Sequence, residues 1–250
     1  MIERYADASG AGGTDLGDAT LAFLREYVDA VVPGQLRLLS GYGVAFESHL
    51  QNSYVVFGAE DWRPRATLVR DLGGIRVHHG RLAERRLAVE TYPDSDLDAD
   101  GRGDLYRKLY YALFQNHLAE LVVALVTATP VEEADCWTLV GECCRDTFER
   151  LRADGSVPAR RIERDEAALF AEPTVHKALT TMRLRGKRHE YVTGEVANPL
   201  ASPRSVADSH VARVPGVGSD ADGNADDDAG TTAGGDTTPG ADVEFPDERR

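Results

Sequence analysis

The chain has 250 residues, 42% of them hydrophobic, so it can bury a sizeable core in one large domain or two small ones. Its formal net charge is −14, and residues 201–250 contribute half of that, with eleven Asp or Glu against four Arg. An acidic excess repels nucleic-acid phosphates and anionic lipids, which argues against nucleic-acid and membrane partners. The same acidity is typical of proteins from salt-loving organisms or, alternatively, of an ordinary acidic protein with a disordered tail.

The cysteines and the apolar runs indicate a cytoplasmic protein. Cys136, Cys143 and Cys144 lie within nine residues and cannot form an even disulfide framework, which fits a reducing compartment. No apolar amino-terminal stretch resembles a signal peptide. The longest apolar run, residues 118–126, contains Glu120 and is too short to span a bilayer.

Composition divides the chain into three parts. Residues 1–17 contain four closely spaced glycines and are expected to form a flexible leader. Residues 18–200 carry regular apolar patterns and should form the folded domain. From residue 201 to 250 Gly, Asp, Thr, Ala and Pro dominate, so this segment is expected to be a disordered acidic tail.

Helical spacing and end signals predict several helices. One should begin at a cap, Asp18, with an interruption at Pro33 and Gly34. Others are expected over 104–126, from Pro130 to a stop at Gly155, over 165–171, and from a cap at Thr174 to Arg185. Between the first two helices, residues 43–57 and 66–78 read as two strands of a β-hairpin. The predicted fold class is α+β, with an antiparallel hairpin backed by a mostly helical carboxy-terminal part.

Polar side chains on this hairpin form the candidate site. Alternation along a strand would place Glu47, His49 and Gln51 on one face, with Arg70 and Asp71 on the paired strand beside two glycines. Carboxylate and amide oxygens suit Mg²⁺, and a guanidinium and an imidazole suit a substrate carboxylate. The alternative interpretation is a solvated outer face without chemistry, as antiparallel sheets often have.

Two motifs resemble those of a known family. Residues 47–52 (Glu-Ser-His-Leu-Gln-Asn) and 70–74 (Arg-Asp-Leu-Gly-Gly) are similar to the Glu-Ala-His-x-Gln-Asn and Arg-Asp-x-x-Gly signatures of siderophore synthetases that act without a nonribosomal assembly line, the IucA/IucC type. Further likenesses, in the family's order, lie at 113–118, 177–184, 191–192 and 198–200.

The resemblance implies the palm portion of a hand-shaped synthetase. It also implies a reaction in which ATP and Mg²⁺ convert a citrate-like carboxylate to an acyl-adenylate that an amine or hydroxylamine-bearing nucleophile attacks. By position, Glu47, Gln51 and Asp71 would hold Mg²⁺, His49 would contact the substrate carboxylate and stabilise developing charge, and Asn52 would lie beside the nucleotide. Arg70 would contact phosphate or pair with Asp71, and Lys177 would meet the anionic substrate or remain solvated.

The sequence departs from the family in one respect. Family members carry a preceding His-Pro segment and a Ser/Thr/Arg cluster that grip ATP and citrate, and neither is found here. We therefore expect one half of a split or truncated ligase, with a separately encoded amino-terminal half and a possible homodimer. The alternatives are a non-catalytic carboxylate-binding module or remnant, and a ferric-siderophore reductase. The reductase is disfavoured because its iron–sulfur cluster uses Cys-Cys and Cys-x-x-Cys, and no Cys follows Cys144.

Overall fold

The computed structural model describes residues 1–8, 15–92, 95–177 and 193–201. Two helices begin the chain, α1 (Ile2–Ala8) and α2 (Leu16–Tyr42). Helix α1 lies in the segment expected to be a flexible leader, and its Tyr5 is buried with its ring edge-on to Phe23 of α2, at 5.4 Å between centroids. The amino-terminal end therefore contributes to the core. Residues 9–14, the rest of that leader up to Asp15, and the expected tail beyond residue 201 lie outside the described residues.

Helix α2 differs from the prediction at its start and at its middle. Its cap is Asp15, whose side chain accepts a hydrogen bond from the Gly17 amide at 2.8 Å, while Asp18 lies in the first turn. The helix also continues through Pro33. Proline removes one hydrogen bond from a helix interior, but the apolar face on both sides of it is buried, which favours one continuous helix. The helix ends at Gly43, whose φ of 70° suits glycine.

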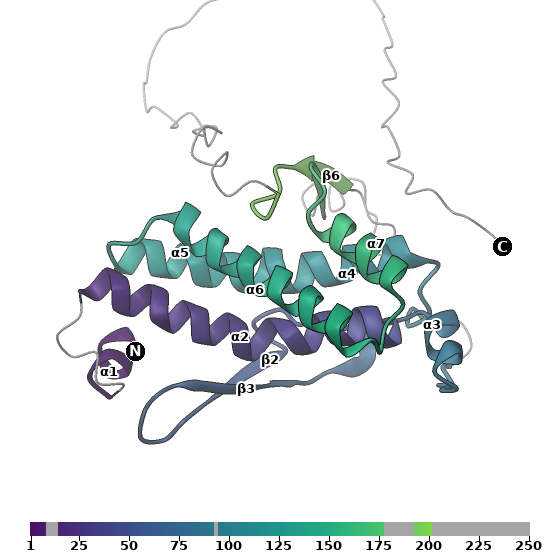
Figure 1. The fold of residues 1–250 in the computed structure, drawn as a ribbon, viewed down its shortest axis with the longest axis horizontal. Coiled ribbons are helices and arrows are strands. Elements are labelled where there is room, and N and C mark those ends of the chain that lie inside the picture. The colour runs from purple at the N-terminus through teal and green to yellow at the C-terminus, as the bar shows by residue number, and fades with distance from the viewer. Residues whose placement is uncertain (9–14, 93–94, 178–192, 202–250) are drawn as a thin grey trace, which may run out of the picture. The chain divides into compact units, whose positions relative to one another are not determined.

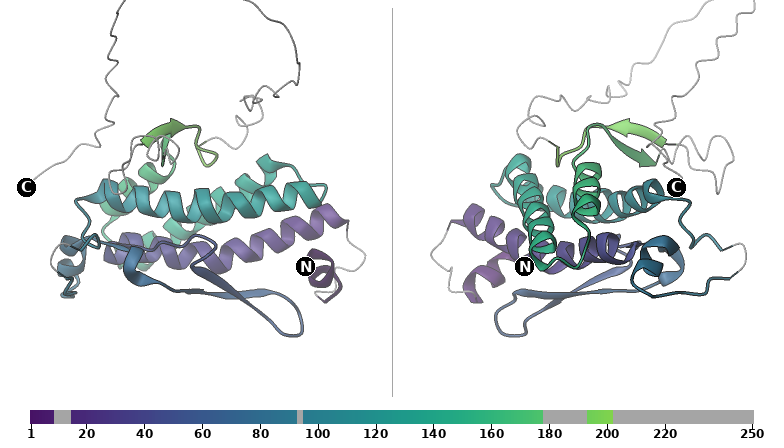
Figure 2. Two further views of the ribbon diagram at one scale, coloured as in Figure 1. Left: turned by 180° about the vertical axis from the view of Figure 1, so that it is seen from behind. Right: turned by 45° about the vertical axis from the view of Figure 1, so that its right-hand side comes forward.

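The two strand-like runs do pair antiparallel, but each is interrupted in the middle. Short strands β1 (Val44–Ala45) and β4 (Arg76–Val77) pair with each other, and β2 (Ser53–Phe57) pairs with β3 (Pro64–Val69). A 3₁₀ turn, η1 (Leu72–Gly74), lies between β3 and β4, and α3 (His79–Glu84) follows. The β2–β3 hairpin runs along α2 (Figures 1 and 2), and the Thr67 hydroxyl donates a hydrogen bond to the Ala30 carbonyl at 3.1 Å.

One long helical segment carries the middle of the chain. It consists of α4 (Arg102–Leu109), a π-helix labelled η2 (Tyr110–Leu118) and α5 (Ala119–Ala128) without a break, close to the predicted range of 104–126. By length and composition this segment could cross a membrane, but half of its most apolar window is buried in the fold. A buried core helix passes the same test, so this is weak evidence for a membrane span.

The remaining elements are mostly helical. Helix α6 (Glu133–Asp154) ends as predicted at Gly155, which has a φ of 63°, and α7 (Ala159–Leu169) begins six residues earlier than expected. The helix predicted from Thr174 is wrong at its start, because β5 (Thr174–Lys177) pairs antiparallel with β6 (Thr193–Val196). In the pairing of Thr174 with Val196, backbone N–H and C=O groups bond across the strands and not within a helix. The rest of that predicted helix lies outside the described residues.

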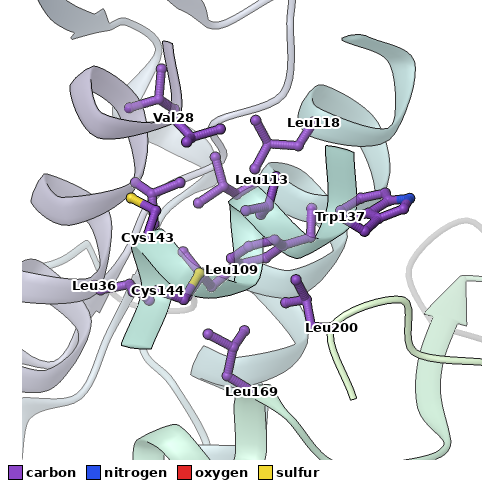
Figure 3. Close-up of a cluster of buried hydrophobic side chains, with 14 of the residues drawn as sticks. Val28, Leu36, Leu109, Leu113, Leu118, Trp137, Cys143, Cys144, Leu169 and Leu200 are labelled. Carbon is purple, nitrogen blue, oxygen red and sulfur yellow. The ribbon is translucent and has the colours of Figure 1, made fainter. Parts of the chain in front are cut away.

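A single core joins the helices. Side chains from α2, the 102–128 helix, α6, α7 and the segment after β6 interlock around Leu113, as Figure 3 shows. Phe23, Phe114 and Phe148 are among the largest fully buried side chains. The predicted α+β fold with a hairpin backed by helices is thus confirmed.

Candidate functional site

The candidate site lies where both strand runs are interrupted. Between β1 and β2 lies the site loop, residues 46–52, and between β3 and β4 lies the glycine turn, residues 70–75. Because β1 pairs with β4 and β2 pairs with β3, the loop and the turn are held side by side at both ends. The signature residues of both motifs are therefore brought together by the fold.

The site loop is not the strand that the sequence pattern predicted. It contains a turn closed by a hydrogen bond from the Asn52 amide to the His49 carbonyl at 2.9 Å. Ser48 and Asn52 are buried, as the expected alternation would have them, whereas Leu50 between them is 48% exposed, which breaks that alternation. The prediction that residues 46–52 form part of a strand is therefore wrong, and the shared face of Glu47, His49 and Gln51 stays a prediction. Backbone hydrogen bonds at Ser48 and Asn52 hold the loop in this conformation and outweigh burial of one leucine.

Buried His117 connects the site loop to the core. Its Nδ1 lies 2.9 Å from the Ser48 carbonyl oxygen, and its Nε2 lies 2.7 Å from the Tyr27 hydroxyl of α2. A carbonyl can only accept, so Nδ1 carries the proton and the Tyr27 hydroxyl donates to Nε2. Burial lowers the pKa of His117 and raises the pKa of Tyr27 to about 12, so both groups are neutral near pH 7.

Glu47 has a cationic partner that sequence reasoning missed. The ammonium of Lys108, on α4 and 7% exposed, donates to Glu47 Oε1 at 2.8 Å. The other carboxylate oxygen packs against Gly74: a Cβ there would lie 1.8 Å from Glu47 Oε2. Gly74 thus leaves room for the Glu47 carboxylate beside the glycine turn. The signal in the sequence was Lys108 itself, a charged residue on the buried side of a helix. That signal does not identify its partner, which lies 61 residues away.

Asp71 begins the glycine turn in an unusual backbone conformation. Its φ is 59° and its side chain is exposed, with Oδ1 beside Gly73, where a Cβ would lie 3.4 Å from it. Left-handed φ is tolerated by Asp better than by most non-glycine residues. Because Gly73 and Gly74 are adjacent, the carboxylates of Asp71 and Glu47 flank the same turn.

Arg70 anchors the turn to the loop. Its amide donates to the Asn52 carbonyl at 2.9 Å, and its Nε donates to the Gln51 carbonyl at 3.2 Å. Its guanidinium also lies over the Tyr54 ring, 5.4 Å from the centroid. These bonds fix the relative position of the two segments.

The other predicted residues are less closely defined. His49 is half-buried beside His117, Gln51 is exposed and Asn52 is 4% exposed. Lys177 ends β5, but its side chain lies outside the described part of the chain, as does the rest of the similar segment 177–184. Asn116 donates to the Tyr111 carbonyl at 2.6 Å, so it and His117 both have hydrogen-bonded roles inside the fold.

A metal and a nucleotide are implied by the resemblance, and the donors present are hard oxygens that suit Mg²⁺. Within the described residues there is no group of three or more His, Cys, Asp and Glu that could hold a metal ion. The predicted set includes an amide, Gln51, with the two carboxylates. Its two carboxylates do flank one turn, which fits a hard cation whose remaining ligands are phosphate oxygens or water.

The cysteines are buried on α6. Burial raises the pKa of the Cys136 thiol to about 11 and that of the Cys143 thiol to about 12, and it holds the pKa of Cys144 well above its usual value. Thiols of this kind are protonated near neutral pH and poor ligands. They pack as small apolar side chains in the core (Figure 3).

Comparison with solved structures defines the class of fold. Petrobactin biosynthesis protein AsbB from Bacillus anthracis matches with a TM-score of 0.64 and 19% identity, over 83% of this chain and 34% of that one. ATP-bound aerobactin synthetase IucA from Klebsiella pneumoniae matches with a TM-score of 0.62 and 19% identity, over 80% of this chain and 33% of that one. The described residues thus have the fold of part of a siderophore synthetase, which confirms the predicted resemblance.

Sequence comparison then gives the family. The family described as "Ferric iron reductase FhuF-like transporter" matches residues 21–192, more than half of the chain, and the chain belongs to it. A curated relative, D-ornithine–citrate ligase of Staphylococcus aureus, is 28% identical over 207 residues, which cover 80% of this chain and 31% of the relative. The chain therefore spans about a third of the length of the synthetases that it resembles.

Proposed function

We propose that this chain supplies part of the active site of a siderophore-synthesising ligase, which joins a citrate-like carboxylate to an amine or hydroxylamine-bearing nucleophile at the expense of ATP. The observation that carries the proposal is the junction of the site loop with the glycine turn, which sets Glu47 and Asp71 beside one turn with His49 close by. The likeness to synthetases in sequence and in fold supports the same reading.

Each residue has a role in this proposal. Glu47, Gln51 and Asp71 would hold Mg²⁺, which when bound neutralises charge on the ATP phosphates. His49 would contact the substrate carboxylate and Asp71 would complete the catalytic set. Asn52 would lie beside the nucleotide, Arg70 would contact phosphate, and Lys177 would meet the anionic substrate. The Lys108 ammonium donates to the Glu47 carboxylate and holds it in place.

The proposed reaction needs little covalent chemistry from the protein. A carboxylate oxygen of the substrate attacks the α-phosphorus of ATP, and pyrophosphate leaves. The amine nitrogen then attacks the acyl carbon of the adenylate, AMP leaves with the bonding electrons, and the nitrogen loses a proton. Positioning of the substrates and neutralisation of their charge would accelerate both steps. A polar loop that is fixed in place by hydrogen bonds can provide both.

We further propose that the rest of the site comes from polypeptide outside this chain. The synthetases that it resembles are about three times as long as the matched region. The partner that we propose is a separately encoded amino-terminal half. A homodimer and a cytoplasmic location remain part of the proposal. The net charge of the protein is negative, so we expect small anionic substrates to be bound through local groups such as the Arg70 guanidinium and the His49 imidazole.

ATP–pyrophosphate exchange tests the proposal. The purified chain, alone and mixed with the product of a neighbouring gene that carries the His-Pro and Ser/Thr/Arg motifs, is incubated with citrate and Mg²⁺, and label transfer from pyrophosphate to ATP is counted. Exchange that needs citrate and disappears in His49→Gln supports a ligase. Mg²⁺-dependent ATP binding without exchange in either sample would instead support a non-catalytic binding module.

The family description favours a second candidate, a ferric-siderophore reductase. A four-thiolate cluster requires more cysteines than the three in this chain, and all three lie buried on one helix. We expect that reconstitution with iron and sulfide gives no cluster absorbance and that a thiol reagent reacts slowly with the native chain but with three thiols after denaturation. A visible cluster spectrum, or three fast-reacting thiols in the native chain, would favour the reductase.

A further inference from the structure

We propose that His117 is a positioning residue for the site loop, and that the π-helix exists in this chain to aim it. The inference rests on the proposed function for its catalytic consequence, but its geometry stands apart from that function. Ser48, whose carbonyl oxygen His117 holds at 2.9 Å, lies between Glu47 and His49, so one hydrogen bond controls the direction of both neighbouring side chains.

The π-helix explains how His117 reaches the loop. Seven residues make about two turns of an α-helix, so Tyr110 and His117 would share a face if the helix were regular. In the structure they serve different partners: the Tyr110 hydroxyl donates to Asn198 Oδ1 at 2.6 Å near β6, and His117 meets Ser48 and Tyr27. In a π-helix the angle between successive side chains around the helix axis is smaller than in an α-helix. Tyr110 and His117 therefore point to different sides, one toward Asn198 and the other toward the site loop.

The two hydrogen bonds of His117, to the Ser48 carbonyl and to the Tyr27 hydroxyl, form a clamp on the site loop, and the second bond makes it rigid. Tyr27 holds His117 Nε2 at 2.7 Å and packs edge-on to the imidazole, with 5.8 Å between ring centroids. Since His117 is fully buried and Tyr27 is 8% exposed, water does not compete for either bond. Helix α2, the π-helix and the site loop are therefore locked together through one imidazole in a single tautomer.

The clamp also keeps the site loop ordered. The Ser48 hydroxyl is buried and has no hydrogen-bond partner among the residues that the structure describes, so the Ser48 carbonyl makes the bond that holds this residue inside. Without the bond to His117, a second buried polar group on Ser48 would be unsatisfied. The loop would then leave the core, and Glu47 would move away from Lys108 and Gly74.

The test uses three variants of the full chain. His117→Asn keeps an N–H donor near the position of Nδ1, His117→Phe removes it while filling the space, and Tyr27→Phe removes only the hydroxyl that fixes Nε2. Amide hydrogen exchange is followed by mass spectrometry in a peptide covering residues 46–53, with a peptide from α6 as the internal reference. The nitrogen chemical shifts of His117 report its tautomer in the wild-type chain.

We expect exchange in the loop peptide to be at least tenfold faster in His117→Phe and close to wild type in His117→Asn, with α6 unchanged. Wild-type His117 should show a protonated Nδ1 and an unprotonated Nε2. If His117→Phe does not fold, Tyr27→Phe decides, with a several-fold faster loop exchange expected. Unchanged loop exchange in the folded variants, or the opposite tautomer, would overturn the proposal.

The catalytic consequence is read separately. Where the wild-type chain with its partner catalyses ATP–pyrophosphate exchange, His117→Phe should lower the rate at saturating substrate at least tenfold, and His117→Asn should restore most of it. If wild type shows no exchange while His117→Phe still loosens the loop, the positioning role stands and the proposed ligase function fails. A loosened loop with full activity would remove the link between the clamp and catalysis.

Discussion

Lys108 and Glu47 meet at 2.8 Å although 61 residues separate them in the chain. The lysine side chain is 6% exposed and the glutamate side chain 28% exposed, so the pair is shielded enough for its loss to matter. Removing one member of such a shielded pair takes a counter-charge from the other member, which costs more than the pair itself contributes. The pair therefore constrains both the fold and the charge of the site.

The Lys108→Met variant should lower the free energy of unfolding by about 1–3 kcal/mol, because Glu47 loses its cation while the aliphatic packing is largely kept. Urea unfolding measures the change. The matched control is Arg107→Met on the same helix. The Arg107 side chain is 46% exposed and its guanidinium lies 3.8 Å from the Asp104 carboxylate, so we expect a change of about 0.5 kcal/mol or less. Equal effects of the two variants would mean that the buried pair does not stabilise the fold.

Asp71 gives a sharper test of the proposed ligand set. Asp71→Asn preserves the shape of the side chain and its tolerance of a left-handed backbone, so the fold should keep its stability to within about 0.5 kcal/mol. Affinity for ATP in the presence of Mg²⁺ should fall at least tenfold, measured by titration calorimetry with and without the metal. Glu60→Gln, at an exposed position in the β2–β3 hairpin loop, is the control. Undiminished Mg²⁺-dependent affinity in Asp71→Asn would remove Asp71 from the set.

For these residues, the sequence predicted which motifs come together better than it predicted where their side chains lie. The motifs at 47–52 and 70–74 do meet in the fold, as expected. Their geometry could not be predicted, because the bond from His117 to the Ser48 carbonyl and the exposure of Leu50 do not follow from local alternation. The partnership of Lys108 with Glu47 also depends on tertiary packing that a local pattern does not encode.

At the scale of elements, burial of His117, which the π-helix places between α2 and the site loop, couples folding to pH. Burial lowers its pKa, with His49 of the site loop adding to the effect and the Tyr27 hydroxyl facing the other nitrogen. The unfolded chain takes up a proton near the ordinary histidine value of about 6.5, while the folded chain resists it. The stabilising contribution is therefore complete above that pH and is lost as pH falls below it.

The wild-type free energy of unfolding should decrease from pH 7 to pH 5 more steeply than that of His117→Asn, by at most about 1.4 kcal/mol per pH unit. His78 contributes a fall of the same sign, because burial lowers its pKa too, so the difference between the two proteins isolates His117. Urea unfolding at a series of pH values measures both slopes. Parallel slopes would show that His117 titrates alike in the folded and unfolded chain.

Helices were the most predictable elements, for physical reasons. The stop of α6 at Gly155 and the extent of the 102–128 segment follow from apolar spacing and from end signals that are local in sequence. The π-helix has no such signal, since its apolar residues also fit an α-helix. Continuation of α2 through Pro33 was missed because core packing outweighed a local breaker, and β5 was missed because its partner, β6, lies beyond a connecting segment.

At the scale of the whole molecule, the described residues include the loop and the turn of the proposed site. The chain spans only about a third of the length of the related synthetases. The predicted fold class was confirmed from the hairpin and the helices together. The acidic tail, a homodimer, a partner half and an origin in a salty environment stay predictions. A whole site cannot be predicted from a chain that matches one part of larger enzymes.

The most direct measurement is ATP–pyrophosphate exchange with citrate and Mg²⁺, using the chain with and without its expected partner half, in high salt to keep an acidic protein folded. We predict citrate-dependent exchange that appears in the mixture, that falls at least tenfold in His49→Gln, and that is lost in Asp71→Asn. The same exchange with these two variants as with wild type, or no exchange in a mixture whose partner binds ATP and citrate, would contradict the account.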